Sequence, residues 1–219
     1  MSEASEIVIS NEALTAAASE SVQQDQNIRS RVRDLTLDAL RTRHLNSAET
    51  GALIKAVTEG ISLGLGKRTG EIKNALSEAM AGLDEALMKS AEATHLALRE
   101  LTSQGKDFTD HELKDALNNL KKLEEEFLST MSLVANSAND KVKQEMKDLV
   151  SHVRRTGSDS GAKVAEALSE FGGRVKVSMT EGAAVGKDAA REMSARLTSV
   201  ASGILSGLAD ALHAKSGKK

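Results

Sequence analysis

The residue pair with metal-ligand spacing in this chain is Glu92 and His95, three positions apart in a helix-forming stretch. Helical bundles that bind two iron ions use such pairs, because side chains at this spacing share one face of a helix. Those sites need two such pairs and further inward glutamates. Here one pair occurs, and Glu124 is the sole acid on the apolar stripe of the following helix. We therefore expect no metal ion and no cofactor, and we expect the histidines to be exposed: His44, His95, His111, His152 and His213.

Residue types suited to covalent catalysis are also scarce. The chain has no cysteine, which excludes a thiolate nucleophile and thiolate metal sites. A serine nucleophile needs a pocket built from strands and loops, and the sequence shows no such mixture of elements. We therefore expect that the protein is not an enzyme.

Five arginines between residues 26 and 43 are the strongest candidates for contacts with phosphates. Asp34 and Asp38 lie among them, and no aromatic residue nearby offers a surface for base stacking. The net charge of −3 shows no excess of basic residues. Nucleic acid is therefore not expected as a partner, and the arginines are expected to form a solvated, ion-paired face: Arg29, Arg31, Arg33, Arg41 and Arg43.

Four glycines lie close together in a helical pattern, at Gly60, Gly64, Gly66 and Gly70. No strand precedes them and no Gly-Lys-Ser/Thr follows, so they do not form a phosphate-binding loop. Each glycine inside a helix costs about 1 kcal/mol relative to alanine. We expect that this cost reflects either a close approach by the helix over residues 26–43 or a flexible point.

Composition and periodicity predict an all-α fold. The chain has no proline, so long helices are not interrupted, and its 3 phenylalanines are the only large aromatic residues, so a wide core is not expected. Apolar residues recur in eleven-residue repeats from Val164 to Leu212. Such a repeat has about 3.67 residues per turn, which keeps the stripe on one helix face. We expect an elongated antiparallel bundle of three long helices plus one short N-terminal helix.

Capping signals and loops divide the chain into segments. Thr109 with Glu112 forms a capping box, and Gly105 suits the end of the helix before it. No stretch is apolar over about 18 residues, and no signal peptide is visible. We expect a disordered acidic tail at 1–25, in which Ser10 or Asn11 could begin a transient helix. We further expect a single bundle domain at 26–213 with helices at about 26–43, 47–103, 110–155 and 158–213, and a basic tail at 214–219.

The segment from Leu197 to Leu212 is the main candidate for a binding site. It has an apolar face, a polar face of Ser, Thr and Gly, and a single charge. Helices of this kind lie in lipid interfaces, where the apolar face supplies the affinity. We expect the end of this helix to extend past the bundle without a partner. The predicted surface-binding residues are Val200, Ile204, Leu205, Leu208 and Leu212; the alternative is that this face completes the bundle or a dimer contact.

Three stretches resemble an uncharacterised bacterial family of all-helical proteins. They are Ala-Met-Ala-Gly-Leu-Asp-Glu-Ala-Leu at 79–87, Lys-Asp-Phe-Thr-Asp-His-Glu-Leu-Lys at 106–114 and His-Val-Arg-Arg-Thr-Gly at 152–157. This resemblance covers roughly residues 28–175 and implies no activity or site residues. In its size, its Ala/Lys/Glu-rich helices and its lack of cysteine, the chain is also similar to phasins. Phasins are cytoplasmic helical proteins that coat polyhydroxyalkanoate granules, so this similarity implies a granule surface as partner.

The sequence thus predicts a non-enzymatic amphipathic helical protein that binds an apolar granule or membrane surface. We expect it in the cytoplasm, peripherally attached to that surface. The alternative is a homo-oligomeric coiled-coil scaffold without lipid or granule binding, in which the same apolar stripes pair between chains. Both interpretations use the same apolar residues. In the first, a granule or membrane surface covers them, and in the second, another chain covers them.

Overall fold

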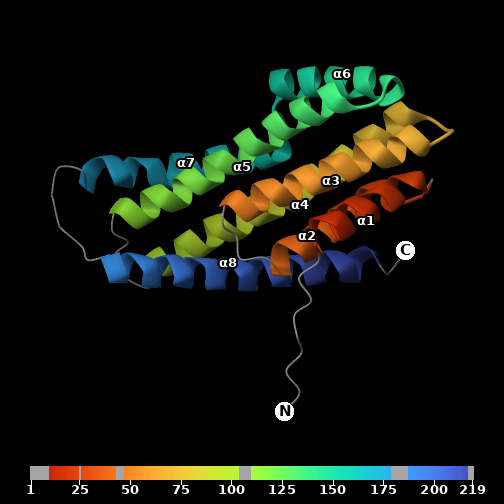
Figure 1. Cartoon of the computed structure of the whole chain (residues 1–219). Helices are drawn as coiled ribbons and strands as arrows, with labels where there is room; N and C mark the ends of the chain where they lie inside the picture. The colour runs from red at the N-terminus through yellow and green to blue at the C-terminus, as the bar shows by residue number, and fades with distance from the viewer. Residues whose placement is uncertain (1–9, 25, 43–46, 104–109, 179–186, 217–219) are drawn as a thin grey trace, which may run out of the picture.

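The structure is a computed structural model, and the residues that it describes form helices and no strand (Figure 1). It describes residues 10–24, 26–42, 47–103, 110–178 and 187–216. The prediction of an all-α fold is confirmed. The helices are α1 (Asn11–Gln23), α2 (Ile28–Thr42), α3 (Ser47–Lys67), α4 (Ile72–Ser103), α5 (Asp110–Ser137), α6 (Asp140–Thr156), α7 (Asp159–Ser178) and α8 (Lys187–Ser216).

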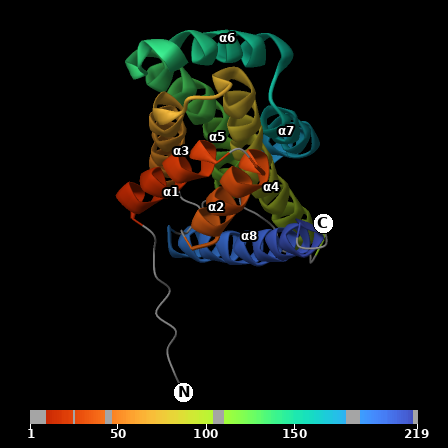
Figure 2. The same cartoon turned by 90° about the vertical axis from the view of Figure 1, so that its right-hand side faces the viewer.

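Two pairs of consecutive helices form the centre of the molecule. The pair α1 and α2 lies on the pair α3 and α4, with α1 packed on α3 and α2 packed on α4. Next to them, α5 packs on α3, and α7 packs on both α4 and α5. Helix α8 lies across α4 and α2, on the side of the molecule opposite α6 (Figures 1 and 2).

A single apolar core includes side chains from every helix. Its members are mostly alanine, leucine and valine, with few large side chains. Small side chains let helix axes approach closely, which compensates for the lack of aromatic volume. Each helix contributes at least one buried residue to this core. In the order α1 to α8, examples are Leu14, Leu37, Leu53, Leu83, Phe127, Val142, Phe171 and Leu205.

The predicted single helix over 47–103 is wrong, because the chain turns back between α3 and α4. At the end of α3 the Arg68 N–H donates to the Leu65 carbonyl oxygen at 3.1 Å. The Arg68 side chain closes the turn onto α1, since its Nη1 donates to the Val22 carbonyl oxygen at 2.7 Å. In a hairpin both helices bury an apolar face in the same core, and one straight helix of this length cannot do so.

The predicted helices over 110–155 and 158–213 are also each divided in two. Helix α6 starts anew after α5, with Asn139 as its N-cap accepting a hydrogen bond from the Val142 N–H at 3.2 Å. The Asn139 side chain occupies the space beside Gly66 of α3. Helices α7 and α8 are separated by residues 179–186, which lie outside the described residues. The arrangement of three long antiparallel helices is therefore wrong.

Within the tail predicted to be disordered over 1–25, residues Asn11–Gln23 form α1. Ser10 is its N-cap, since Ser10 Oγ accepts from the Ala13 N–H at 3.2 Å. Leu14, Ala18 and Val22 recur at every fourth position and are fully buried. The prediction is wrong here because a short apolar stripe of small residues finds a partner in α3. Residues 1–9, and residues 217–219 of the predicted basic tail, lie outside the described residues.

Helix α1 approaches α3 where glycines leave space. A Cβ at Gly60 would overlap the Thr15 carbonyl oxygen, and a Cβ at Gly64 would overlap the Ser19 carbonyl oxygen. The predicted close approach at these glycines is confirmed, but the approaching helix is α1 and not the helix over 26–43. Helix α2 uses a different glycine, since a Cβ at Gly82 of α4 would overlap the Arg29 carbonyl oxygen.

Replacing Gly60 with alanine should lower the free energy of unfolding by about 1–3 kcal/mol, because the added methyl group displaces the backbone of α1. The matched control is Gly203→Ala, since no atom lies within 4 Å of a Cβ at this helical glycine. There alanine should raise stability by about 0.5–1 kcal/mol through its helix propensity. Urea denaturation measures both changes. Stabilisation by Gly60→Ala would contradict the docking of α1 at this position.

Candidate functional site

The predicted surface-binding residues lie on α8, in the part that packs against α2 and α4. Leu205 is fully buried, as are its neighbours one turn away, Ala201 and Ala209. The expectation that this end of the helix has no partner is therefore wrong. Because the segment 47–103 folds back on itself, the bundle is shorter than expected and α2 lies beside α8. The other four predicted residues are half-buried: Val200, Ile204, Leu208 and Leu212.

Arg41 of α2 ties α8 down by polar contacts. Its Nη2 lies 3.0 Å from Asp210 Oδ1, and its Nε donates to Ser206 Oγ at 3.3 Å. Asp210 is the single charged residue between Leu197 and Leu212. The C-terminal half of α8 is thus attached by a narrow apolar stripe and by one guanidinium group.

The outer face of α8 carries four small, uncharged, exposed residues at four-residue intervals: Ser199, Gly203, Gly207 and Ala211. No atom lies within 4 Å of a Cβ at Gly203 or Gly207. Gly60 and Gly64 of α3 differ in this respect, since they are in contact with α1. Packing within the described part of the chain therefore does not explain the glycines of α8.

His95, which we expected to be exposed, is buried between α4 and α7. Its side chain is 3% exposed, and its Nε2 lies 2.7 Å from Glu170 Oε2. Its Nδ1 lies 3.9 Å from Glu166 Oε1, and its ring meets Phe171 edge to face at 5.8 Å between centroids. The expectation is wrong because α7 covers this face of α4. The sequence does offer a signal for this contact, since the four-residue spacing of Glu166 and Glu170 places both carboxylates on one face of a helix.

The surroundings of His95 form an ion-paired cluster and not a metal site. Arg99 Nε lies 3.3 Å from Glu170 Oε1. A hydrogen bond from the Lys163 side chain lowers the pKa of the Glu166 carboxyl, and the charges of Lys163, His95 and Arg99 act in the same direction, against desolvation. Glu92 pairs with Lys89 at 2.7 Å and so does not act with His95. Among the described residues, no group of three or more His, Asp and Glu side chains is arranged to hold a metal ion.

A second polar cluster fixes the start of α7. Asp84 of α4 accepts hydrogen bonds from the Asp159 N–H at 2.8 Å and from the Ser160 hydroxyl at 2.6 Å. Glu124 of α5 accepts from the Ser158 hydroxyl at 2.7 Å. Carboxylates at a helix N-terminus satisfy its free N–H groups and complement its dipole. This cluster therefore fixes the position of α7 along α4, so that Glu166 and Glu170 lie next to His95.

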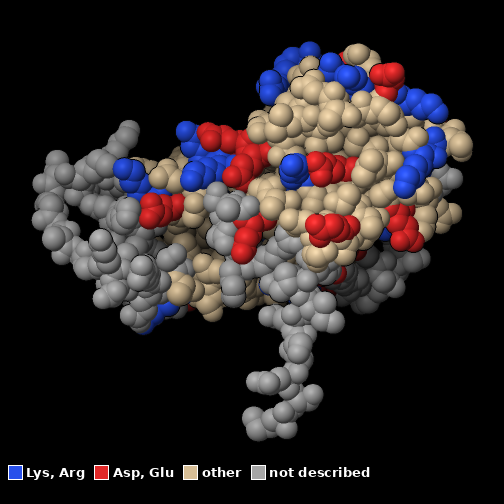
Figure 3. All heavy atoms as spheres, in the orientation of Figure 1, with Lys and Arg blue, Asp and Glu red and all other residues tan. Residues whose placement is uncertain are grey.

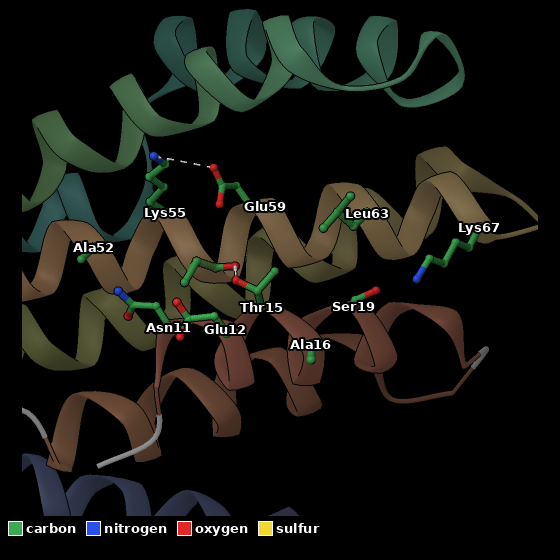
Figure 4. Close-up of a pocket in the computed structure, with 11 residues that line it drawn as sticks. Asn11, Glu12, Thr15, Ala16, Ser19, Ala52, Lys55, Glu59, Leu63 and Lys67 are labelled. Carbon is green, nitrogen blue, oxygen red and sulfur yellow. Dashed lines mark hydrogen bonds and ion pairs between the residues drawn. The ribbon is translucent and has the colours of Figure 1, made fainter.

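An open groove of about 630 Å³ lies between α1 and α3 (Figure 4). Charged side chains of both signs line it together with alanines, and Lys55 Nζ lies 3.8 Å from Glu59 Oε1. Hydrogen bonds from its own backbone N–H, and then from Ser10, lower the pKa of Glu12, which also lines the groove. No histidine lines the groove, and its two glutamates are balanced by two lysines, so it shows no excess of positive charge for an anion.

Gly60-Ile61-Ser62-Leu63-Gly64 matches the Gly-x-Ser-x-Gly pattern of serine hydrolases by residue type, although we expect no serine nucleophile from the sequence. That pattern places its serine on a sharp turn between a strand and a helix. Here the five residues lie inside α3, Ser62 is buried, and the two glycines receive α1. The match therefore carries no catalytic meaning.

Three arginines of α2 form ion pairs, as predicted, but not all of them are solvated: Arg29, Arg33 and Arg41. Arg29 Nε lies 2.9 Å from Glu85 Oε2, and Arg33 is buried while it pairs with Asp34 at 2.7 Å. Arg43 lies outside the described residues. Acidic and basic side chains are interspersed over the face in Figure 3, with no broad patch of one sign.

Comparison with known proteins identifies the family of this chain but indicates no function for it. The chain belongs to a family of unknown function (DUF6781), which it matches over residues 4–214. Neither the curated proteins nor the solved structures show a significant match to it. The resemblance to an uncharacterised helical family is confirmed, and the likeness to phasins gains no support. No helix within the described ranges is long and apolar enough to cross a membrane.

Replacing His95 with alanine should lower the free energy of unfolding by about 2–3 kcal/mol, because it leaves a cavity beside Phe171 and removes one of the two partners of Glu170. The control is His152→Ala, at an exposed histidine of α6, where a change within about 0.5 kcal/mol is expected. Thermal or urea unfolding measures both. Equal effects at the two positions would contradict the role of His95 in joining α4 to α7.

Proposed function

We propose that this protein binds an apolar surface, such as a storage granule or a lipid interface, through α8 and without catalysing a reaction. The observation that carries the proposal is the place of α8, whose apolar stripe lies on α2 and α4 at the outside of the molecule (Figure 1). The remaining helices also pack on one another, α1 on α3, α2 on α4 and α7 on α4 and α5. In this proposal these contacts keep the bundle folded when α8 is released.

Release of α8 is the step that makes binding possible, because the described surface offers little apolar area. Its large exposed apolar side chains are Leu63, at 56%, and Leu133, at 67%. Single leucines of this kind are normal on proteins in water. The stripe of α8 has the spacing and the near-neutral polar face of a helix that lies in an interface. The closed bundle is then the storage form, and α8 on the surface is the bound form.

The free-energy balance favours weak and reversible binding. A Leu or Ile side chain gains about 1.5–3 kcal/mol when it is fully buried. Leu205 already has this gain in the bundle, and Ile204, Leu208 and Leu212 have part of it. Adsorption is driven only by the additional burial that these side chains gain at the surface. The entropy lost when the protein is ordered and held there reduces this gain in free energy further. Small changes in how firmly α8 is docked therefore change the amount of bound protein.

The resemblance to phasins in composition supports a granule as the surface and the cytoplasm as the compartment. In this proposal the protein is attached peripherally, through one helix. Neutral lipid or polyester suits the site better than a strongly anionic surface, since α8 presents Asp210 beside its apolar stripe.

The alternative is a homo-oligomeric coiled-coil scaffold without lipid or granule binding. The small, uncharged outer face of α8 favours it, because Gly203 and Gly207 leave room for a helix of another chain. A thermal midpoint that rises with protein concentration, together with no adsorption to any surface, would select this alternative.

The double substitution Ile204→Asp with Leu208→Asp should reduce flotation with neutral phosphatidylcholine vesicles and polyester particles by roughly tenfold or more, because two carboxylates remove the affinity of the apolar face. Circular dichroism should show that helical content persists. The control is Leu133→Asp, which changes an exposed leucine of α5 and should leave flotation unchanged.

Two results would contradict the proposed function. One is wild-type flotation by the Ile204→Asp, Leu208→Asp protein. The other is an equal loss of flotation by Leu133→Asp, since it would point to a general effect of surface charge and not to the face of α8.

A further inference from the structure

We propose that the contact of Arg41 with Asp210 and Ser206 is an autoinhibitory latch, which keeps α8 on the bundle and limits exposure of its apolar stripe. The inference rests on the proposed function for its consequence, adsorption. Its structural part, control of the opening of α8, is measured separately.

The geometry of the latch joins one guanidinium to two successive turns of α8. Nη2 of Arg41 lies 3.0 Å from Asp210 Oδ1, and Nε lies 3.3 Å from Ser206 Oγ. Ser206 and Asp210 are four residues apart and thus share one face of the helix. A planar guanidinium with donors in fixed directions suits such a two-point contact better than an ammonium group does. The last turns of α8 cannot lift from α2 without breaking both contacts.

The sequence of α8 singles out Asp210. Between Leu197 and Leu212 it is the sole charged residue, in a stretch otherwise suited to an apolar interface. A charge beside the apolar stripe opposes adsorption, and the same charge faces Arg41 in the bundle. Asp210 therefore favours the closed form in two ways. Its charge is stabilised by Arg41 when α8 lies on the bundle, and the same charge costs free energy when α8 lies on an apolar surface.

Because both side chains of the latch are at least partly exposed to water, the strength of their ion pair depends on the salt concentration. The side chain of Asp210 is 68% exposed and that of Arg41 is 27% exposed. Ion pairs this accessible to water are weak and are screened by salt. We therefore expect the latch to change the open population of α8 by about two- to fivefold and to lose effect at high ionic strength.

A neighbouring carboxylate supplies the matched control. Asp38 lies 3.6 Å from Arg41 Nη1, in an ion pair between two residues of α2. Asp38→Asn and Asp210→Asn remove the same charge from the same guanidinium at nearly constant shape. Only Asp210→Asn opens the latch.

The experiment is hydrogen exchange of the α8 backbone amides of the full chain, at low and high salt, with flotation on neutral phosphatidylcholine vesicles and polyester particles. At low salt, Asp210→Asn should speed exchange over residues 200–212 by about two- to fivefold. High salt should bring the wild type to the same rate, and Asp38→Asn should behave as wild type. Adsorption of Asp210→Asn should rise by a similar factor.

The two readouts separate the latch from the proposed function. Unchanged exchange in Asp210→Asn, or an equal increase in Asp38→Asn, overturns the latch whatever the adsorption. Faster exchange in Asp210→Asn alone, with no adsorption by any form of the protein, supports the latch and overturns surface binding.

Discussion

Backbone contact at glycines sets the spacing of the central helices, and the rest of the structure depends on it. Gly60 and Gly64 bring α1 onto α3, and Gly82 brings α2 onto α4. A chain with 3 phenylalanines and no tryptophan or tyrosine cannot fill wide gaps between helices, so its core is continuous only if the helices lie close together. Each of these glycines weakens its own helix by about 1 kcal/mol, which the tighter packing must offset.

This close packing leaves α8 as the outermost helix over α2 and α4. The polar clusters place the other helices more firmly: Asp84 and Glu124 hold the start of α7, and His95 joins α7 to α4 from within. At the C-terminal half of α8, the described polar attachment is Arg41, at a largely exposed position. This difference between buried and exposed polar contacts underlies the proposed exchange of α8 between the bundle and a surface.

Local signals in the sequence predicted the helical class, the helix that became α2 and the start of α7. They did not predict the turn after Lys67 or the division at Asn139, because long-range burial decides both. Asn139 followed by Asp140 is a readable N-cap signal. For α1 the sequence indicates a helix start at Ser10 or Asn11, but not the packing of this helix on α3. The five residues predicted to bind a surface lie in a helix, but their cover by α2 depends on the α3–α4 turn and is not predicted. Their role at a surface stays a prediction.

The central claim is that α8 must leave the bundle before the protein binds an apolar surface. The chain has no cysteine, so Arg41→Cys with Asp210→Cys creates the only two thiols, and a cleavable bis-maleimide about as long as the lost ion pair can join them. The measurement is flotation with polyester particles before and after cleavage of the linker. We predict that the cross-linked protein stays behind and that the cleaved protein floats. Equal flotation of both would contradict the account.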